Sequence, residues 1–131
     1  MHFEIKKISD WSFFRIPELE KSGITHGFCT NSSPSNLLHS ETKQNFLDVF
    51  SLNDLVVMNQ EHGDNVHVIS NGEKPCSGDG LIIIEKRVAG IIKTADCLPI
   101  ILCDASYPIA SIIHSGWRGT AKRIVMKSIL A

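Results

Sequence analysis

The segment LIIIEKRVAGIIKTADCLPIILCDASYPIASIIHSG, residues 81–116, determines the fold class of this chain. It contains short apolar runs, rich in β-branched residues, that Gly, Pro, Asp and charged residues separate. These runs are LIII (81–84), VAGII (88–92), LPIILC (98–103) and IASII (109–113). The pattern predicts a β-strand for each run, and the continuous apolar character predicts that several strands are buried on both faces.

The residues before this segment extend the same pattern. LVVM (55–58) and VHVI (66–69) are further β-branched runs and predict two more strands. Asn71-Gly72 and Gly78-Asp79-Gly80 are turn signals between the runs. We therefore expect a set of short strands joined by loops from residue 55 to residue 113.

Helical patterns flank the strands. Thr30 to Ser40 is rich in Ser, Asn and Pro and predicts a loop, after which Ser40 is the expected N-cap of a helix over SETKQNFLDVF (40–50). A second helix is expected over TAKRIVMKSILA (120–131). Its expected apolar stripe consists of Ile124, Val125, Ile129 and Leu130. No Gly, Asn or Pro ends this helix, so we expect one domain, residues 1–131, that is incomplete at its C-terminus.

Composition and charge argue against a nucleic-acid partner and against a membrane span. Of the 131 residues, 43% are apolar and 21% are charged, and the net charge of −1 argues against a nucleic-acid partner. Because the sequence has no apolar run of about 18 residues, it predicts no membrane span. The charged start MHFEIKKISDW does not resemble a signal peptide, so we expect a cytoplasmic protein.

Three side chains that can bind a metal follow or end apolar runs: His62, Cys97 and His114. In α/β sheets, functional side chains gather at the carboxyl ends of strands. Two imidazoles and a thiolate suit Zn²⁺, and three protein ligands leave a position for water or substrate, as in catalytic zinc sites. Spacings of 35 and 17 residues match no local zinc motif, so separate structural roles for the three residues stay open.

Other residues are candidates for supporting roles. Asp96 is a candidate hydrogen-bond acceptor for a ligand imidazole, and Glu61 or Asp96 for proton transfer. Arg118, with the amides of the Gly116–Gly119 turn, is the best anion site in the sequence. His67 is expected on the outward face of its strand, and Trp117 is expected to anchor packing rather than to stack on a base.

Several motifs together resemble the YfiH family, also called the laccase-domain or polyphenol oxidase family. The motifs are HGFCT (26–30), QEHGDNV (60–66), SGDGLI (77–82), KTADCLPIILCD (93–104) and IIHSGWRGT (112–120). The resemblance implies an α/β fold of layered mixed sheets with flanking helices. It also implies zinc on His62, Cys97 and His114.

The resemblance further implies purine nucleoside processing, with a nucleoside and phosphate as small-molecule partners. The implied reactions are phosphorolysis of adenosine, inosine or methylthioadenosine, and deamination of adenosine. On this basis we predict catalytic roles for Cys97, Asp96 and Arg118, and substrate binding by His26 and Arg118. Family members have Arg where this chain has Asn31, which predicts weaker anion binding here, and they continue well beyond the helix that follows GWRG.

Alternative functions remain open at this stage. Copper is less expected than zinc, because multicopper sites need many paired histidines and this chain has six histidines without an HxH pair. Met58 could imitate an axial copper ligand but is expected to pack in its strand. Cys97 could instead be the nucleophile of a cysteine hydrolase with a histidine base. A non-catalytic metal- or nucleotide-binding module, as a monomer or an oligomer, is the third alternative.

Overall fold

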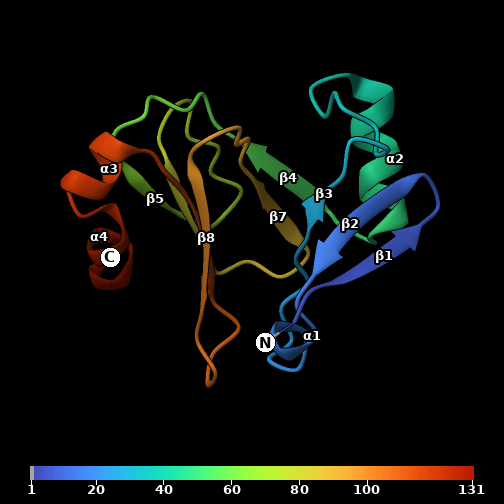
Figure 1. The fold of residues 1–131 in the computed structure, drawn as a ribbon, viewed down its shortest axis with the longest axis horizontal. Coiled ribbons are helices and arrows are strands. Elements are labelled where there is room, and N and C mark those ends of the chain that lie inside the picture. The colour runs from blue at the N-terminus through green and yellow to red at the C-terminus, as the bar shows by residue number, and fades with distance from the viewer. Residues whose placement is uncertain (1) are drawn as a thin grey trace. The chain divides into compact units, whose positions relative to one another are not determined.

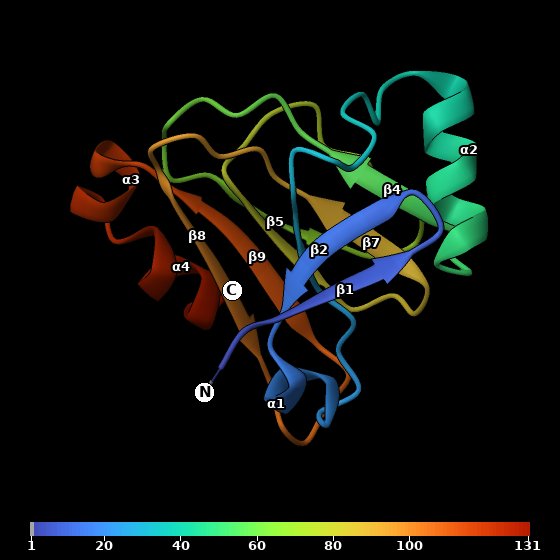
Figure 2. The same cartoon turned by 45° about the vertical axis from the view of Figure 1, so that its right-hand side comes forward.

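The chain forms two compact units, Met1–Asn53 and Asp54–Ala131. The computed structural model describes residues 2–131, and Figures 1 and 2 show its ribbon from two directions. The expectation of a single domain over residues 1–131 stays a prediction. Within the described residues, no helix has both the length and the apolar character needed to cross a membrane.

The N-terminal unit contains an antiparallel sheet that the sequence analysis did not predict. Its strands are β1 (Glu4–Ile8), β2 (Trp11–Arg15) and β3 (Phe28–Cys29), in the order β1-β2-β3. Helix α1 (Pro17–Glu20) follows β2, and helix α2 (Ser40–Val49) ends the unit. The alternation of β1 is visible in hindsight, because its half-buried and exposed side chains alternate along Glu4–Ile8.

Helix α2 packs through aromatic side chains within this unit. Trp11 lies edge-on to Phe46, with ring centroids 4.9 Å apart, and its indole N–H donates to Asn45 Oδ1 at 2.9 Å. The predicted helix is confirmed, but its N-cap is His39 and Ser40 is already helical. His39 has extended backbone angles and its carbonyl accepts from Lys43 N–H, so the helix begins one residue earlier than an N-cap at Ser40 would place it.

The C-terminal unit contains two sheets that use every predicted strand. Strands β4 (Asp54–Val57) and β7 (Val88–Ile91) form a parallel pair. The second sheet has the order β5-β6-β9-β8, with β5 (Val66–Ile69), β6 (Gly80–Ile83), β9 (Ala110–Ser115) and β8 (Leu98–Cys103). The strand predictions from the six apolar runs are confirmed to within about two residues at each end. The fold is therefore mixed α/β, as expected.

The two faces of the four-stranded sheet have different partners. On one face Leu81 lies opposite Ile112, and a Cβ on Gly90 of β7 would approach both side chains. This places β7 against that face, where Leu81 packs with Met58 and Ile69 in the core of the unit. Met58 is therefore a core residue, as expected. Helix α4 (Ile124–Leu130) covers the other face, which Figure 2 shows from the side.

Two expectations about burial in this sheet are wrong. Strand β8 is half-exposed rather than buried on both faces, because it occupies the edge of the sheet, and Leu98 is 62% exposed. His67 does not face outward. It lies opposite the fully buried Leu81, and its Nε2 contacts the carbonyl of Ser77 at 2.8 Å.

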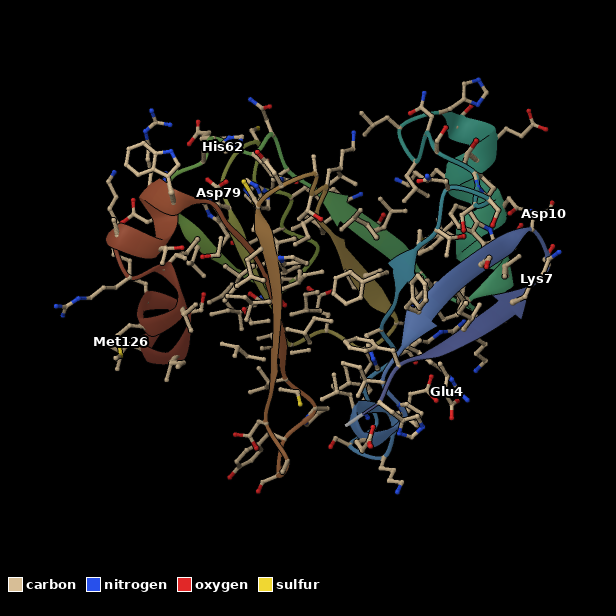
Figure 3. All side chains as sticks on the ribbon, viewed as in Figure 1. Glu4, Lys7, Asp10, His62, Asp79 and Met126 are labelled. Carbon is tan, nitrogen blue, oxygen red and sulfur yellow. The ribbon has the colours of Figure 1, made fainter. Side chains whose placement is uncertain are left out.

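The predicted C-terminal helix is broken into α3 (Trp117–Ala121) and α4 by Arg123, whose φ of 61° is left-handed. The predicted apolar stripe is wrong at Ile129 and Leu130. Ile124 and Ser128 face the sheet, whereas Ile129 and Leu130 are exposed. Because successive residues turn by about 100°, positions 129 and 130 point well away from position 124. Figure 3 shows the likewise exposed Met126 on the outer side of α4.

Candidate metal centre

The loops that carry His62 and Cys97 start from neighbouring strand ends. Strands β4 and β7 are parallel, and their last residues, Val57 and Ile91, are partners in the pairing register. The chain therefore leaves both strands at the same edge and enters the loops that contain His62 and Cys97. His114 comes from β9, where it is paired with Pro99 of β8, two residues beyond Cys97.

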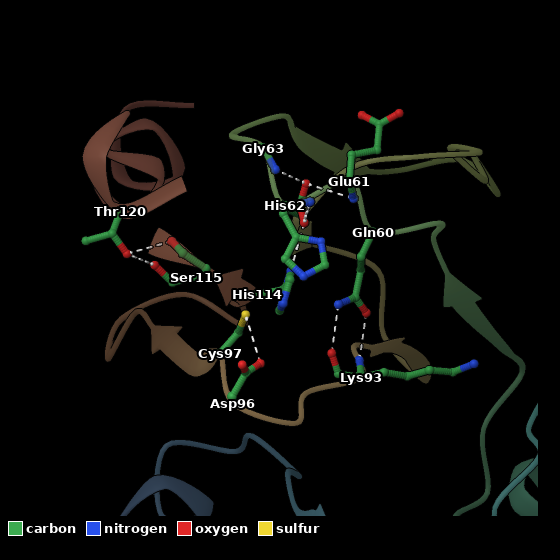
Figure 4. A network of polar contacts seen from close by, with 12 residues as sticks. Gln60, Glu61, His62, Gly63, Lys93, Asp96, Cys97, His114, Ser115 and Thr120 are labelled. Carbon is green, nitrogen blue, oxygen red and sulfur yellow. Dashed lines mark hydrogen bonds and ion pairs between the residues drawn. The ribbon is translucent and has the colours of Figure 1, made fainter. Parts of the chain in front are cut away.

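His62, Cys97 and His114 come together as the sequence predicted. One ligand atom from each residue lies within 4.8 Å of the other two. The two imidazole rings are nearly perpendicular, with centroids 4.8 Å apart (Figure 4). A Cβ on Gly116 would lie 3.3 Å from Cys97 Sγ and 3.4 Å from His62 Cδ2, so a glycine here leaves room for the two ligands. Three donors at this spacing could hold one metal ion.

A buried carboxylate that the sequence analysis treated only as a turn residue supports this group. Asp79 is fully buried, and its Oδ1 lies 2.8 Å from Nδ1 of His114, which is 2% exposed. The backbone N–H of His114 also donates to the carbonyl of Asp79, at 2.7 Å. Asp96 was predicted to accept a hydrogen bond from a ligand imidazole. The structure gives that role to Asp79 instead. A carboxylate between two glycines just before a buried strand was the available signal.

The same carboxylate binds the loop that contains His62. The backbone amides of Glu61, His62 and Gly63 donate to Asp79 at 3.3, 2.9 and 2.9 Å. Burial alone would raise the pKa of Asp79, but the hydrogen bonds from His114 and these amides outweigh it and hold the pKa below its usual value. Asp79 is therefore a carboxylate at neutral pH. His62 itself has a left-handed φ of 57°, an uncommon conformation that the loop contacts must maintain.

Gln60 joins the His62 loop to the Cys97 loop. Its amide nitrogen donates to the carbonyl of Lys93, and its amide oxygen accepts from the Lys93 N–H, both at 2.7 Å. The side chain thus pairs with the Lys93 backbone as a neighbouring strand would (Figure 4). Sequence reasoning missed this role, although Gln60 lies two residues before a predicted ligand.

Replacing Gln60 by alanine should loosen this junction. Both hydrogen bonds are lost, and the net contribution of a hydrogen bond is about 1 kcal/mol, so we expect the free energy of unfolding to fall by about 1–2 kcal/mol. Hydrogen exchange of the Lys93 amide should accelerate. Gln44→Ala in α2, which removes an exposed bond to Asp48, is the control. Unchanged Lys93 protection in Gln60→Ala would contradict this assignment.

The thiol of Cys97 makes a long hydrogen bond and has a raised pKa. Its Sγ donates to Asp96 Oδ1 at 3.8 Å. Burial first, then the negative charge and hydrogen bond of Asp96 and the charge of Asp79, raise the pKa of the Cys97 thiol. Without a cation the sulfur is therefore a protonated thiol at neutral pH, and a metal would have to displace that proton.

The remaining predicted site residues have different surroundings. Arg118 is exposed, and its guanidinium lies 4.4 Å from the centroid of the Trp117 ring. Trp117 is 72% exposed, so its predicted packing role is wrong. In the N-terminal unit, His26 Nε2 accepts from Ile16 N–H at 2.9 Å, and Nδ1 lies 3.4 Å from the carbonyl of Ile24. These bonds favour a structural role for His26, and its predicted role in substrate binding stays a prediction.

Comparisons with known proteins show which family the chain belongs to. The model of the family described as multi-copper polyphenol oxidoreductase laccase matches residues 23–131. A Clostridium acetobutylicum protein named purine nucleoside phosphorylase is 30% identical over 129 residues, which cover 96% of this chain and 54% of that protein. A protein of an unknown prokaryotic organism named adenosine deaminase RL5 is 37% identical over 83 residues, 56% of this chain and 32% of that protein. The chain spans about half the length of the first of these relatives, and its match covers about a third of the second.

Solved structures show the same fold. The crystal structure of the Bacillus licheniformis hypothetical protein YfiH matches 97% of this chain and 57% of that chain, with a TM-score of 0.75 and 21% identity. A Neisseria meningitidis protein, NMB0706, matches 99% of this chain and 57% of that chain, with a TM-score of 0.59. With the family match over residues 23–131, these likenesses show that the chain belongs to the laccase-domain, or YfiH, family.

Proposed function

We propose that this chain provides the zinc centre of an enzyme that processes purine nucleosides, by phosphorolysis, by deamination of adenosine, or by both. The observation that carries the proposal is the convergence of His62, Cys97 and His114, with ligand atoms within 4.8 Å of one another. The relatives named purine nucleoside phosphorylase and adenosine deaminase supply the substrate class. Because the chain covers about half of the first relative, the complete activity is part of the proposal.

The donor set fits zinc better than a multicopper centre. Two imidazole nitrogens and one thiolate are common zinc ligands, and three protein ligands leave one position open. The description of the family names copper, but a multicopper site needs more histidines than the two that meet here. Zinc bound in this way supplies a Lewis acid that can polarise a substrate oxygen or activate a water molecule.

Residues beside the proposed ligands have chemistry that suits proton transfer and anion binding. The carboxylate of Asp96 lies next to Cys97, whereas in Figure 4 the carboxylate of Glu61 points away from the ligand side chains. Asp96 is therefore the better candidate to carry a proton. Arg118 is exposed, with its guanidinium over the Trp117 ring, so its N–H groups are available to a phosphate.

The cysteine hydrolase alternative has less support. A nucleophilic cysteine needs a lowered pKa or a base in hydrogen-bond contact. The pKa of Cys97 is raised, and its described hydrogen bond goes to Asp96 rather than to an imidazole. If Cys97 is instead a metal ligand, added zinc should protect it from alkylation by iodoacetamide.

The proposal predicts a metal-dependent activity in the purified chain. We expect about one zinc per chain by elemental analysis, and release of free base from adenosine or inosine with phosphate, or of inosine from adenosine without it. Removal of the metal with a chelator should abolish turnover, and zinc should restore it. His39→Ala, an exposed histidine of the N-terminal unit, is the control and should keep its metal, whereas His62→Ala should lose it.

The outcomes separate the candidate functions. Zinc binding with nucleoside binding but without turnover would support a non-catalytic module. Alkylation of Cys97 that zinc does not slow, together with hydrolysis in the absence of metal, would support the cysteine hydrolase. A chain that binds no metal would refute the proposed function.

A further inference from the structure

We propose that Asp79 is the positioning residue of the metal centre, and that one carboxylate sets the orientation of two of the three proposed ligands. The inference rests on the proposed function, because it assigns Asp79 a task in a metal site formed by His62, Cys97 and His114. Asp79 is fully buried. It acts through the His114 ring and through the loop that contains His62.

The first task is to select the form of the His114 ring. A carboxylate can only accept hydrogen bonds, so the proton in the 2.8 Å contact must be on Nδ1 of His114. In a neutral ring, Nε2 then carries the free lone pair that a metal needs. Both residues are almost completely shielded from solvent, so no water competes for this contact. Asp79 thus determines which nitrogen of His114 is available.

The second task is to hold the loop of the other histidine. Three consecutive amides, those of Glu61, His62 and Gly63, converge on the two oxygens of Asp79. Three amides that point at one carboxylate require a tight local turn, and His62 adopts its left-handed conformation within it. Oδ1 accepts from both His62 N and His114 Nδ1, so a single oxygen atom links the two proposed ligands.

The isosteric amide cannot perform both tasks. In Asp79→Asn, an NH₂ group replaces one of two oxygens that together accept four hydrogen bonds. If the NH₂ faces His114, Nδ1 must accept, and the ring proton moves to Nε2, where it blocks the metal. If the NH₂ faces the loop, it opposes the N–H groups of Glu61 and Gly63. Either arrangement impairs one ligand.

The test measures zinc affinity directly, apart from any activity. Competition with a chromophoric chelator on the full chain should show zinc binding weakened about 10- to 100-fold in Asp79→Asn, the range typical of partners that orient metal ligands. Asp104→Asn is the matched control, because Asp104 also accepts from backbone amides, those of Ser106 and Tyr107, in the β8–β9 turn. Its zinc affinity should stay within about twofold of the wild type.

The second readout is the form of the His114 ring without metal. Long-range ¹H–¹⁵N correlation spectra of the metal-free wild type should show His114 with its proton on Nδ1. Asp79→Asn should show the proton on Nε2, or a mobile loop at residues 61–63. A structural role in folding alone would not move this proton. If Asp79→Asn does not fold, the wild-type spectrum decides, and a neutral wild-type His114 ring with its proton on Nε2 and none on Nδ1 would overturn the proposal.

The two proposals fail in different ways. If the wild type binds no zinc, the proposed function fails. If the wild type binds zinc and folded Asp79→Asn binds it equally well, the function stands and the role of Asp79 is refuted. Weakened binding together with the altered ring form supports both.

Discussion

Replacing Cys97 by serine should remove zinc from the chain and abolish any zinc-dependent turnover. A serine hydroxyl is a poor zinc ligand beside a thiolate, and two imidazoles alone leave the centre incomplete. Loss of a direct ligand should exceed the 10- to 100-fold effect of losing an orienting partner, so we expect zinc affinity to fall by more than about 100-fold. Elemental analysis and chelator competition on the same samples measure this.

Cys103→Ser is the matched control for this variant. Cys103 is a half-buried free cysteine at the far end of β8, about 20 Å from Cys97 along an extended strand. It should keep the metal and the activity of the wild type. Wild-type metal content in Cys97→Ser would remove Cys97 from the proposed centre.

Replacing Gly119 by alanine should destabilise the chain, although the same change usually stabilises a helix by about 1 kcal/mol. A Cβ at position 119 would lie 2.5 Å from the carbonyl oxygen of Gly63. That oxygen belongs to the backbone of the loop that Asp79 holds, so the loop or α3 must move. Overpacking of this kind costs about 1–3 kcal/mol, and the displaced loop should also weaken zinc binding at His62. Urea unfolding and chelator competition measure the two effects.

Gly63→Ala tests the same contact from its other side. A Cβ there would meet only Asp79 Oδ2, at an ordinary 3.6 Å, and Gly63 does not have a positive φ. The stability of this variant should therefore stay close to that of the wild type. If Gly119→Ala were as stable as Gly63→Ala, the close approach of α3 to the loop would not constrain the site.

The strands of the C-terminal unit were predictable because they depend on local patterns. Short β-branched runs between turn residues specify strands, and residues that follow such runs collect at strand ends. The parallel pairing of β4 and β7 explains why this reasoning brought His62 and Cys97 together. The exposed Trp117 was mispredicted, because an aromatic side chain is usually buried and the sequence does not show that helix α3 points it to solvent.

The sequence by itself determined the strand positions of the C-terminal unit and the mixed α/β class, since both follow from residue type and spacing. It also named the three side chains that the fold brings together. The tertiary structure alone decided which carboxylate meets His114. Asp79 and His114 are 35 residues apart, and only the antiparallel register of β6 and β9 places them together. The break at Arg123, after which Ile124 is buried and Ile129 is exposed, also depends on the tertiary structure. A one-residue slip would turn the side chains of a strand to the other face of the sheet, so this pairing depends on how β6 and β9 pack together, which neither strand shows alone.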